Sequence, residues 1–261
     1  MILIIDVGNT HTDFALFQQG KLFTSWHLLT KINYTVDKYA TVLLKILKQN
    51  GLDFTALRGV GISSVVPPMT PVLKNLSIRF LGLSPIVVGE PGIDPGLRLL
   101  IKEPETVGSD VVAAKQAFGG ETLIIDCGTV TAFMPTDTHG NFCGAVFMPS
   151  LRLFKESLSS EVALLPDIPL ARAKRVIGKN TTEAMQSGLF FGYVDMVNGL
   201  IRRIFNELGQ ELPIVVTGGF APLLTDHISA KVTHDPALTL KGIYYIYARN
   251  RYLLEEHKKV S

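Results

Sequence analysis

Short apolar runs alternate with longer amphipathic stretches along most of the chain. Runs that are apolar throughout, and too short for helices, are typical of strands buried in a sheet. Because helical patterns separate most of these runs, the chain is expected to fold as an α/β protein. We expect strands at Ile2–Ile5, Val60–Val66, Pro85–Val88, Leu123–Ile125, Gly144–Phe147 and Ile214–Thr217.

Three amphipathic stretches predict helices. In Thr35–Asn50 the apolar residues recur at the spacing of about 3.6 positions that places them on one helical face. Gly51 follows as a stop signal for this helix. The other two expected helices are about Thr181–Leu208, interrupted at Gly188 and Gly192, and about Leu238–His257.

The sequence contains an internal repeat. The segment Ile4-Ile5-Asp6-Val7-Gly8-Asn9-Thr10 is echoed 120 residues later by Ile124-Ile125-Asp126-Cys127-Gly128-Thr129-Val130. Each copy is followed by an expected strand, a polar turn that contains glycine, and another expected strand. These segments are Asp13–Phe17, Gln18–Gly20 and Leu22–His27 after the first copy, and Thr131–Met134, Asp137–Asn141 and Phe142–Phe147 after the second. We therefore expect two similar halves with a cleft between them.

An acid followed by a glycine turn, after a buried strand, is suited to binding phosphate. Gly8 permits a tight turn in which successive backbone N–H groups face one anion, and Asp6 is placed to hold a metal ion or its waters. Asp126 and Gly128 repeat this arrangement. The alternative is that each Asp only caps a hairpin turn, but the repetition favours a pair of loops that clamp a polyphosphate. Neutral donors follow both acids: Asn9, Thr10 and Thr12 in the first copy, and Thr129 and Thr131 in the second.

A third glycine turn, Gly218-Gly219, follows the apolar run Ile214–Thr217. Glycines at a strand end allow the backbone to approach a flat ligand closely, although a plain strand-to-helix turn would also explain them. The sequence contains neither the Gly-x-x-x-x-Gly-Lys-Ser/Thr motif of a P-loop nor the motif Gly-x-Gly-x-x-Gly. A nucleotide site would therefore depend on the three glycine turns.

Composition narrows the possible functions. The 261 residues include 47% hydrophobic and 18% charged side chains, which excludes a disordered chain. A formal charge of +2, from 25 basic and 23 acidic residues, argues against a general nucleic-acid binder. Cys127 and Cys143 lie in apolar runs and are expected to be buried reduced thiols. The first apolar run has no basic segment before it and is too short for a signal sequence or a membrane span, so a cytoplasmic protein without membrane contact is expected.

The three glycine turns, in this order, resemble those of the actin-like ATPase superfamily, and the closer resemblance is to the type III pantothenate kinases. It covers nearly the whole chain. This resemblance implies two similar actin-like (ribonuclease H-like) halves, residues 1–117 and 118–261, with the nucleotide in the cleft between them. It also implies ATP-dependent phosphorylation of the pantothenate hydroxyl to 4'-phosphopantothenate, the first step of coenzyme A synthesis. The resembling segments are Asp6–Thr10, Ser63–Pro67, Pro104–Asp110, Ile125–Thr129, Gly178–Thr181 and Thr217–Gly219.

The resemblance assigns roles to individual positions. Asp110 would be the general base, because a primary alcohol is a poor nucleophile until its proton is accepted; the same residue also suits the N-cap of a helix. Asp126 would ligate a monovalent cation, potassium or ammonium, in addition to the Mg²⁺ carried by ATP. A homodimer with the site near the subunit interface is also implied. The ATP-binding residues would be Asp6, Val7, Gly8, Asn9, Thr10, His11, Thr12, Asp13, Thr129, Gly218 and Gly219, and the pantothenate-binding residues Gly108, Ser109, Asp110, Val111 and Thr181.

The acceptor side departs from the family pattern. Val111 stands where family members usually have Arg, Ile101 where they usually have Tyr, and Ser150 where they usually have Gly. Loss of the Arg would remove a contact with the pantothenate carboxylate worth about 2 kcal/mol, or about thirtyfold in affinity. Two alternatives follow: a related small-molecule kinase with another acceptor, or a catalytically silent nucleotide-binding regulator. The retained Asp110 argues against the regulator. Basic residues that could compensate for the missing Arg are Arg98, Lys102 and Arg152.

The first loop contains two further polar residues. His11 could donate a hydrogen bond to phosphate. Asp13 adds a second acid, which would either help to hold a hydrated cation or weaken the binding of an anion. The remaining histidines show no metal-ligand spacing and are expected in neutral core or surface positions: His27, His139, His227, His234 and His257.

Overall fold

The computed structural model describes residues 1–100, 112, 120–161 and 165–254. The protein divides into two compact units, of which the first comprises Met1–Ala117 and Ala237–Ser261 and the second comprises Phe118–Pro236. The C-terminal segment therefore belongs with the first unit, whereas the family resemblance implied a second half of residues 118–261.

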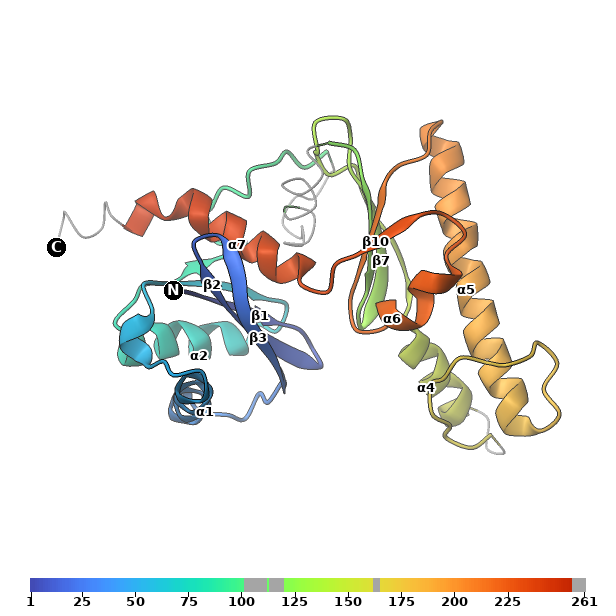
Figure 1. The fold of residues 1–261 in the computed structure, drawn as a ribbon, viewed down its shortest axis with the longest axis horizontal. Helices are drawn as coiled ribbons and strands as arrows, with labels where there is room; N and C mark the ends of the chain where they lie inside the picture. Colours follow the sequence, from blue (N-terminus) through green and yellow to red (C-terminus); the bar gives the residue numbers. More distant parts are fainter. Residues whose placement is uncertain (101–111, 113–119, 162–164, 255–261) are drawn as a thin grey trace. The chain divides into compact units, whose positions relative to one another are not determined.

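The first unit is built on a five-stranded sheet (Figure 1). β1 to β3 form an antiparallel meander, and β4 and β5 extend the sheet on the other side of β1 as parallel strands. β1 is almost completely buried, as expected for a central strand with helices on both faces of its sheet. In spatial order the strands are β3 (Lys21–Leu29), β2 (His11–Gln18), β1 (Ile2–Val7), β4 (Gly59–Ser64) and β5 (Ile86–Val87).

The second unit contains a sheet with the same strand order and the same strand directions. β6 to β8 form an antiparallel meander, and β9 and β10 are parallel to β6. Each strand of one sheet thus has a counterpart in the other, so the duplication predicted from the repeated Asp-x-Gly segment is confirmed. In spatial order the strands are β8 (Val146–Pro149), β7 (Val130–Pro135), β6 (Leu123–Cys127), β9 (Ile214–Thr217) and β10 (Val232–His234).

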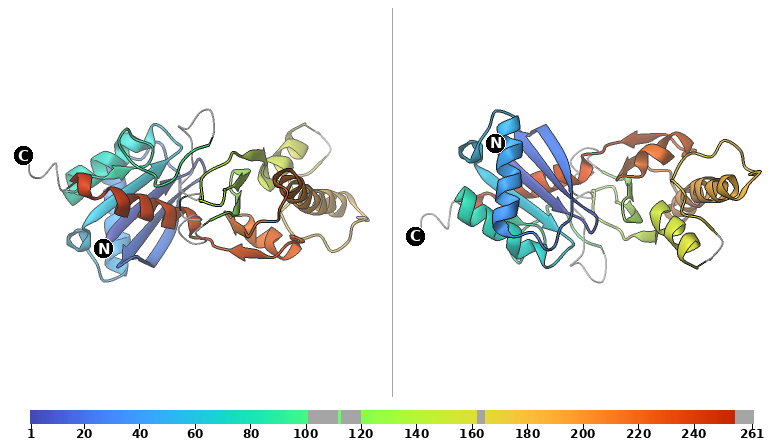
Figure 2. Two further views of the ribbon diagram at one scale, coloured as in Figure 1. Left: turned by 90° about the horizontal axis from the view of Figure 1, so that it is seen from above. Right: turned by 90° about the horizontal axis from the view of Figure 1, so that it is seen from below.

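Helices cover both faces of the first sheet (Figure 2). α1 (Val36–Gln49) and α2 (Met69–Leu76) pack on one face, and a wider helical turn at Ser77–Leu81 continues α2. The side chain of Thr35 caps α1 by accepting a hydrogen bond from the N–H of Lys38 at 3.3 Å. A short 3₁₀ turn, Phe54–Ala56, leads from α1 to β4.

The last helix, α7 (Leu238–Asn250), packs on the opposite face of the first sheet. Its apolar residues Leu240, Ile243 and Ile246 join Ile4 and Ala15 in one buried cluster. This burial explains why the C-terminal helix belongs with the first unit, although it follows the second unit in sequence.

The second sheet has its own buried core on the side of α4 (Leu151–Glu161) and α5 (Thr181–Leu208). Asn180 caps α5 by accepting from the N–H of Glu183 at 2.9 Å, and Gly209 ends it in a left-handed conformation. Between these ends α5 is continuous, so the expected interruption at Gly188 and Gly192 is wrong. Its buried face compensates for the low helix propensity of these glycines. A short helix, α6 (Ala221–Leu224), and a 3₁₀ turn, Thr225–His227, connect β9 to β10.

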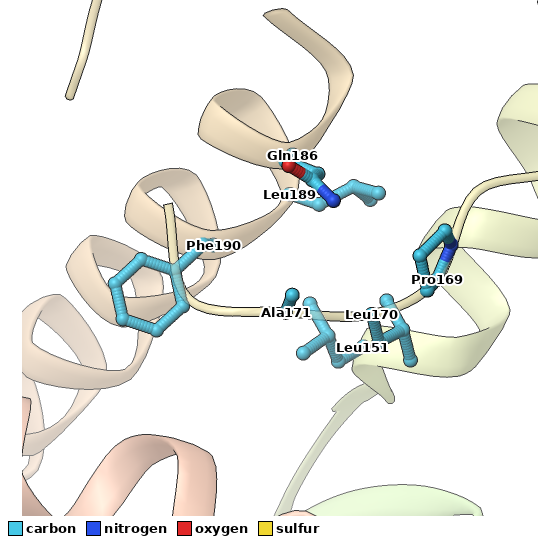
Figure 3. A pocket seen from close by; sticks show the side chains of 7 residues that line it. All are labelled: Leu151, Pro169, Leu170, Ala171, Gln186, Leu189 and Phe190. Atoms are coloured by element: carbon cyan, nitrogen blue, oxygen red, sulfur yellow. The ribbon is translucent and has the colours of Figure 1, made fainter. Parts of the chain in front are cut away.

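The segment before α5 fills the space between α4 and α5 (Figure 3). Pro169, Leu170 and Ala171 lie along this segment, opposite Leu151 of α4 and Leu189 of α5. The crevice they line has no room for a water molecule. It is therefore part of the packing of the second unit and not a site for a ligand.

Several elements differ from those that the apolar pattern predicts. β8 comprises Val146–Pro149, whereas the strand was expected to end at Phe147, and Phe142 makes only an isolated bridge to Thr136. α7 ends at Asn250, before the expected end at His257, which lies outside the described residues. Three elements were not expected from the sequence at all: α2, α4 and β10.

Two glycine substitutions, one inside α5 and one before it, are expected to have opposite effects on stability. Gly188→Ala is expected to raise the free energy of unfolding by up to about 1 kcal/mol, because no atom lies within 4 Å of the added Cβ. Gly178→Ala is expected to lower it by about 2 kcal/mol, because the Cβ would lie 2.3 Å from the backbone N of Ala184 in the first turn of α5. Urea unfolding measures both. A destabilising Gly188→Ala would contradict a helix that continues through this position.

Candidate functional site

The first acid–glycine loop is a three-residue turn, Gly8–Thr10, between β1 and β2. The N–H of Gly8 donates to the carbonyl of His11 at 2.9 Å, so it closes the hairpin and does not face a ligand. Thr30 fastens the turn from outside: its hydroxyl donates to the carbonyl of Gly8 at 2.7 Å, and its N–H donates to the carbonyl of Thr10 at 3.0 Å. These bonds hold the loop in a defined shape before any ligand binds.

The residues of this loop differ in exposure. Asn9 and His11 are exposed, and Asp6, Gly8, Thr10 and Asp13 are half-buried. Val7 and Thr12 are completely buried, and the hydroxyl of Thr12 lies 3.0 Å from that of Thr30. The side chains of these two residues therefore support the loop from beneath. The exposed and half-buried residues are the ones that remain accessible to a ligand.

A row of polar side chains crosses the first sheet beside the loop. In register, Asp6 of β1 lies opposite Ser63 of β4 on one side and Asp13 of β2 on the other, and Asp13 lies opposite His27 of β3. Asp13 Oδ1 and His27 Nδ1 are 2.5 Å apart. Sequence reasoning singled out Asp6 and Asp13 but placed His27 among the residues without a specific role. Only the pairing of β2 with β3 brings His27 to the site.

The second acid–glycine loop is one residue shorter than the first. β6 ends at Cys127 and β7 begins at Val130, so Gly128 and Thr129 form the turn. Thr131 lies opposite Cys127 as Thr12 lies opposite Val7, and both threonines are completely buried. Thr131 is therefore the structural counterpart of Thr12. The hydroxyl of Thr12 pairs with that of Thr30, and the hydroxyl of Thr131 pairs with that of Tyr193.

The corresponding row of the second sheet has a different character. Asp126 of β6 lies opposite Thr217 of β9 and Ala132 of β7, and Ala132 lies opposite Phe147 of β8. Phe147 is 71% exposed, which is unusual for a phenylalanine in a strand. It was not recognised in the sequence, because an apolar residue in a strand pattern gives no sign that it faces solvent.

The Gly218-Gly219 turn packs against the end of β6. The N–H of Phe220 donates to the carbonyl of Cys127 at 3.1 Å, and Gly218 has a φ of 91°, in the left-handed region. A Cβ on Gly218 would lie 2.5 Å from Asp126 Oδ1. The second and third glycine turns are therefore parts of one local structure around Asp126, a relation that the sequence order did not reveal.

Beneath the second loop the ionisable groups are held neutral. Burial, and next the nearby Asp126 carboxylate, raise the pKa of the Cys127 thiol to about 12. Burial raises the pKa of the Tyr193 hydroxyl to about 12 as well. At the other end of β7, where the N–H of Cys143 donates to the carbonyl of Pro135, burial also raises the pKa of the Cys143 thiol. The expectation of burial is confirmed for Cys127, whereas Cys143 is only half-buried.

The Gly178–Thr181 segment forms the start of α5. The Glu183 carboxylate accepts from the N–H of Lys179 at 2.9 Å, while the N–H of Glu183 donates to the side chain of Asn180, so the two residues cap the helix together. The hydrogen bond from Lys179 holds the pKa of Glu183 below its usual range. Thr181, the first residue of α5, is exposed. Ser150 is buried before α4, where its hydroxyl accepts from the N–H of Leu153 at 3.3 Å.

The remaining predicted site residues fall outside the described part of the chain. These are Gly108, Ser109, Asp110 and Val111, together with Ile101 and Lys102. Within the described residues, no group of three or more His, Cys, Asp or Glu side chains could hold a metal ion. In the same residues, no helix has both the length and the apolar character needed to cross a membrane.

Known proteins resemble this chain over most of its length. The sequence model of the type III pantothenate kinase family matches residues 2–203. A Bacillus cytotoxicus protein named type III pantothenate kinase is 36% identical over 260 residues, which cover 98% of this chain and 99% of that relative.

Solved structures share the fold at lower identity. A Campylobacter jejuni protein classed in the Baf family of transcriptional activators has a TM-score of 0.58 at 16% identity, covering 96% of this chain and 99% of its own. Component A of (R)-2-hydroxyglutaryl-CoA dehydratase from Acidaminococcus fermentans has a TM-score of 0.56 at 13% identity, covering 95% and 98%. A Listeria monocytogenes protein described as an N-acetylmannosamine kinase has a TM-score of 0.54 at 13% identity, covering 96% and 99%. These likenesses support the fold of two similar actin-like halves.

The packing at Asp126 predicts a strong effect of a methyl group at Gly218. Gly218→Ala is expected to lower the free energy of unfolding by about 2 kcal/mol, because the added Cβ overlaps Asp126 and the backbone is in the left-handed region. Gly219→Ala is the matched control: no atom lies within 4 Å of its Cβ, so its effect should stay within about 0.5 kcal/mol. Equal losses in thermal unfolding of the two variants would contradict the packing.

The raised pKa values of Cys127 and Tyr193 predict lower stability at alkaline pH. Both groups bind their protons more tightly in the folded state, so their contribution is complete below the unfolded pKa values of 9.0 and 10.0 and is lost as pH rises to about 12. Each group should lower the free energy of unfolding by up to about 1.4 kcal/mol per pH unit in that window. Urea unfolding at pH 8 to 11 measures the slope, and Tyr193→Phe should make it shallower. An unchanged slope in this variant would exclude Tyr193 as a source.

Proposed function

The chain belongs to the type III pantothenate kinase family, and from this we propose how its residues divide the transfer of phosphate from ATP to the hydroxyl of pantothenate. The enzyme is a kinase that catalyses the first step of coenzyme A synthesis. The observation that carries this function is the family match over residues 2–203, supported by 36% identity to a relative along 98% of the chain. The acceptor is therefore pantothenate, in spite of the replacements at Val111 and Ile101.

The first loop, Asp6 to Asp13, would surround the ATP phosphates, and Thr129, Gly218 and Gly219 would complete the nucleotide site. Asn9, at the exposed tip of the rigid first turn, and the half-buried Thr10 offer neutral groups to the phosphates. Phosphoryl transfer needs little covalent chemistry from the protein, so such preorganised groups supply most of the catalysis. The Gly218-Gly219 turn would lie near the adenosine part of the nucleotide. The packing of Gly218 beside Asp126 supports this position.

The acids at the ends of β1 and β6 suit cations. Mg²⁺ and potassium are hard ions that prefer oxygen ligands, and Asp6 and Asp126 each present a half-buried carboxylate beside a glycine turn. Asp6 would hold the Mg²⁺ carried by ATP through its waters, and Asp126 would hold potassium or ammonium. The cations would neutralise charge that develops on the phosphates, so the site would not need a surplus of basic residues.

The acceptor is bound by Gly108, Ser109, Val111 and Thr181, and Asp110 accepts the proton of the hydroxyl that attacks ATP. A positioned carboxylate is suited to this step, because the alcohol must lose its proton as the new bond to phosphorus forms. The exposure of Thr181 at the N-terminus of α5 leaves its hydroxyl accessible to pantothenate. We also propose a homodimer that works in the cytoplasm, as the family resemblance implies.

The role of Asp110 predicts a specific loss of turnover. Wild-type protein given ATP, Mg²⁺, potassium and pantothenate is expected to form 4'-phosphopantothenate. Asp110→Asn should lower kcat by a factor of about 10² to 10⁴ and change the KM for ATP little, because the amide cannot accept the proton. Mass spectrometry of the product and coupled detection of ADP measure both quantities.

Asp37→Asn is the matched control for this substitution, because Asp37 is an exposed acid in the first turn of α1. The Asp37→Asn variant should phosphorylate pantothenate at the same rate as the wild type. Full activity of Asp110→Asn would refute its role as general base. ADP formation by the wild type with another alcohol, but not with pantothenate, would refute the assigned acceptor.

A further inference from the structure

The Asp13–His27 pair lies beside the proposed phosphate loop and has no assigned role. The two side chains face each other across β2 and β3, with Asp13 Oδ1 and His27 Nδ1 2.5 Å apart. Because an ionised carboxylate only accepts hydrogen bonds, the imidazole Nδ1–H is the donor. On the other side of Asp13, in the same row, lies Asp6.

Asp13 creates an electrostatic problem for ATP binding. Directly opposed positions in an antiparallel pair have Cβ atoms about 5 Å apart, and like charges there repel each other. The register of β1 and β2 places Asp13 opposite Asp6 and one position from the pair Val7 and Thr12 at the base of the turn. An uncompensated carboxylate at this point would repel both Asp6 and a triphosphate on the loop.

The second half of the protein indicates that Asp13 and His27 act as a unit. At the positions equivalent to Asp13 and His27, the second sheet has Ala132 and Phe147. That row carries neither the acid nor its partner, although its strands and its first acid, Asp126, are equivalent. The acid and the imidazole are thus present together in one row and absent together from the other.

We propose that His27 is a positioning residue for ATP. By donating to Asp13, it holds this carboxylate on the side of β3 and partly offsets its negative potential, so that the carboxylate does not turn toward the loop and repels the phosphates less. The inference rests on the proposed ATP-binding role of the first loop.

Stability of the fold does not account for the pair. The side chain of His27 is 66% exposed and that of Asp13 is 31% exposed. Ion pairs and hydrogen bonds this accessible to water contribute little to the free energy of unfolding. Their effect is expected where a second charge comes close to Asp13, that is, when the polyphosphate binds.

The test is a double-mutant cycle read out as ATP affinity. His27→Ala should weaken the binding of a fluorescent ATP analogue by a factor of about three to ten, both in Mg²⁺ and in EDTA, while thermal unfolding stays unchanged. In the Asp13→Asn background, His27→Ala should have no further effect, because the repelling charge is gone. His27→Arg, which retains a donor and a positive charge, should restore the affinity.

Three outcomes would overturn the proposal. Unchanged affinity in His27→Ala would show that Asp13 needs no partner. An equal loss in both backgrounds would show that His27 contacts ATP directly. A loss in Asp13→Asn that occurs only with Mg²⁺ would show that Asp13 holds the cation. If the wild type does not bind ATP at all, the proposed function itself fails, which this titration distinguishes from failure of the role of His27.

Discussion

The register of the two central strands is the constraint on which both loops depend. Leu3, Ile4 and Ile5 of β1 and Leu123, Ile124 and Ile125 of β6 are almost completely buried. A strand buried on both faces cannot slip along its neighbours without moving apolar side chains out of their packing. Because the register is defined in this way, Asp6 and Asp126 reach the same point in their sheets, one residue before the strand ends and the glycine turn begins.

The two halves share this framework but have different side chains around the acid. In the first sheet the row through Asp6 contains a serine, a second acid and a histidine. In the second sheet the row through Asp126 contains a threonine, an alanine and an exposed phenylalanine. In the second unit the glycine turn at Gly218 also packs against Asp126 and the backbone of Cys127. A duplicated fold has thus supplied two equivalent positions, and substitution around them has given each position its own chemistry.

Much of the candidate site could be predicted from local sequence. The repeat, the acids and the glycine turns were recognisable because each depends on residues that are adjacent in the chain. His27 could not be found in this way, because it reaches Asp13 only through the pairing of β3 with β2. Phe147 could not be found either, because it joins the row of Asp126 only through the pairing of β8 with β7. The continuity of α5 was also missed, because its glycines lower helix propensity while the packing of its buried face outweighs that cost.

The chain alone therefore specified the α/β class, the duplication and the two acid–glycine loops, since periodicity and turn chemistry are local properties. Tertiary structure decided the rest. It assigned α7 to the first sheet, because Leu240, Ile243 and Ile246 are buried against Ile4 and Ala15. It also paired His27 with Asp13 and packed Gly218 against Asp126. These are contacts between distant segments, and they form only where burial of apolar surface brings those segments together.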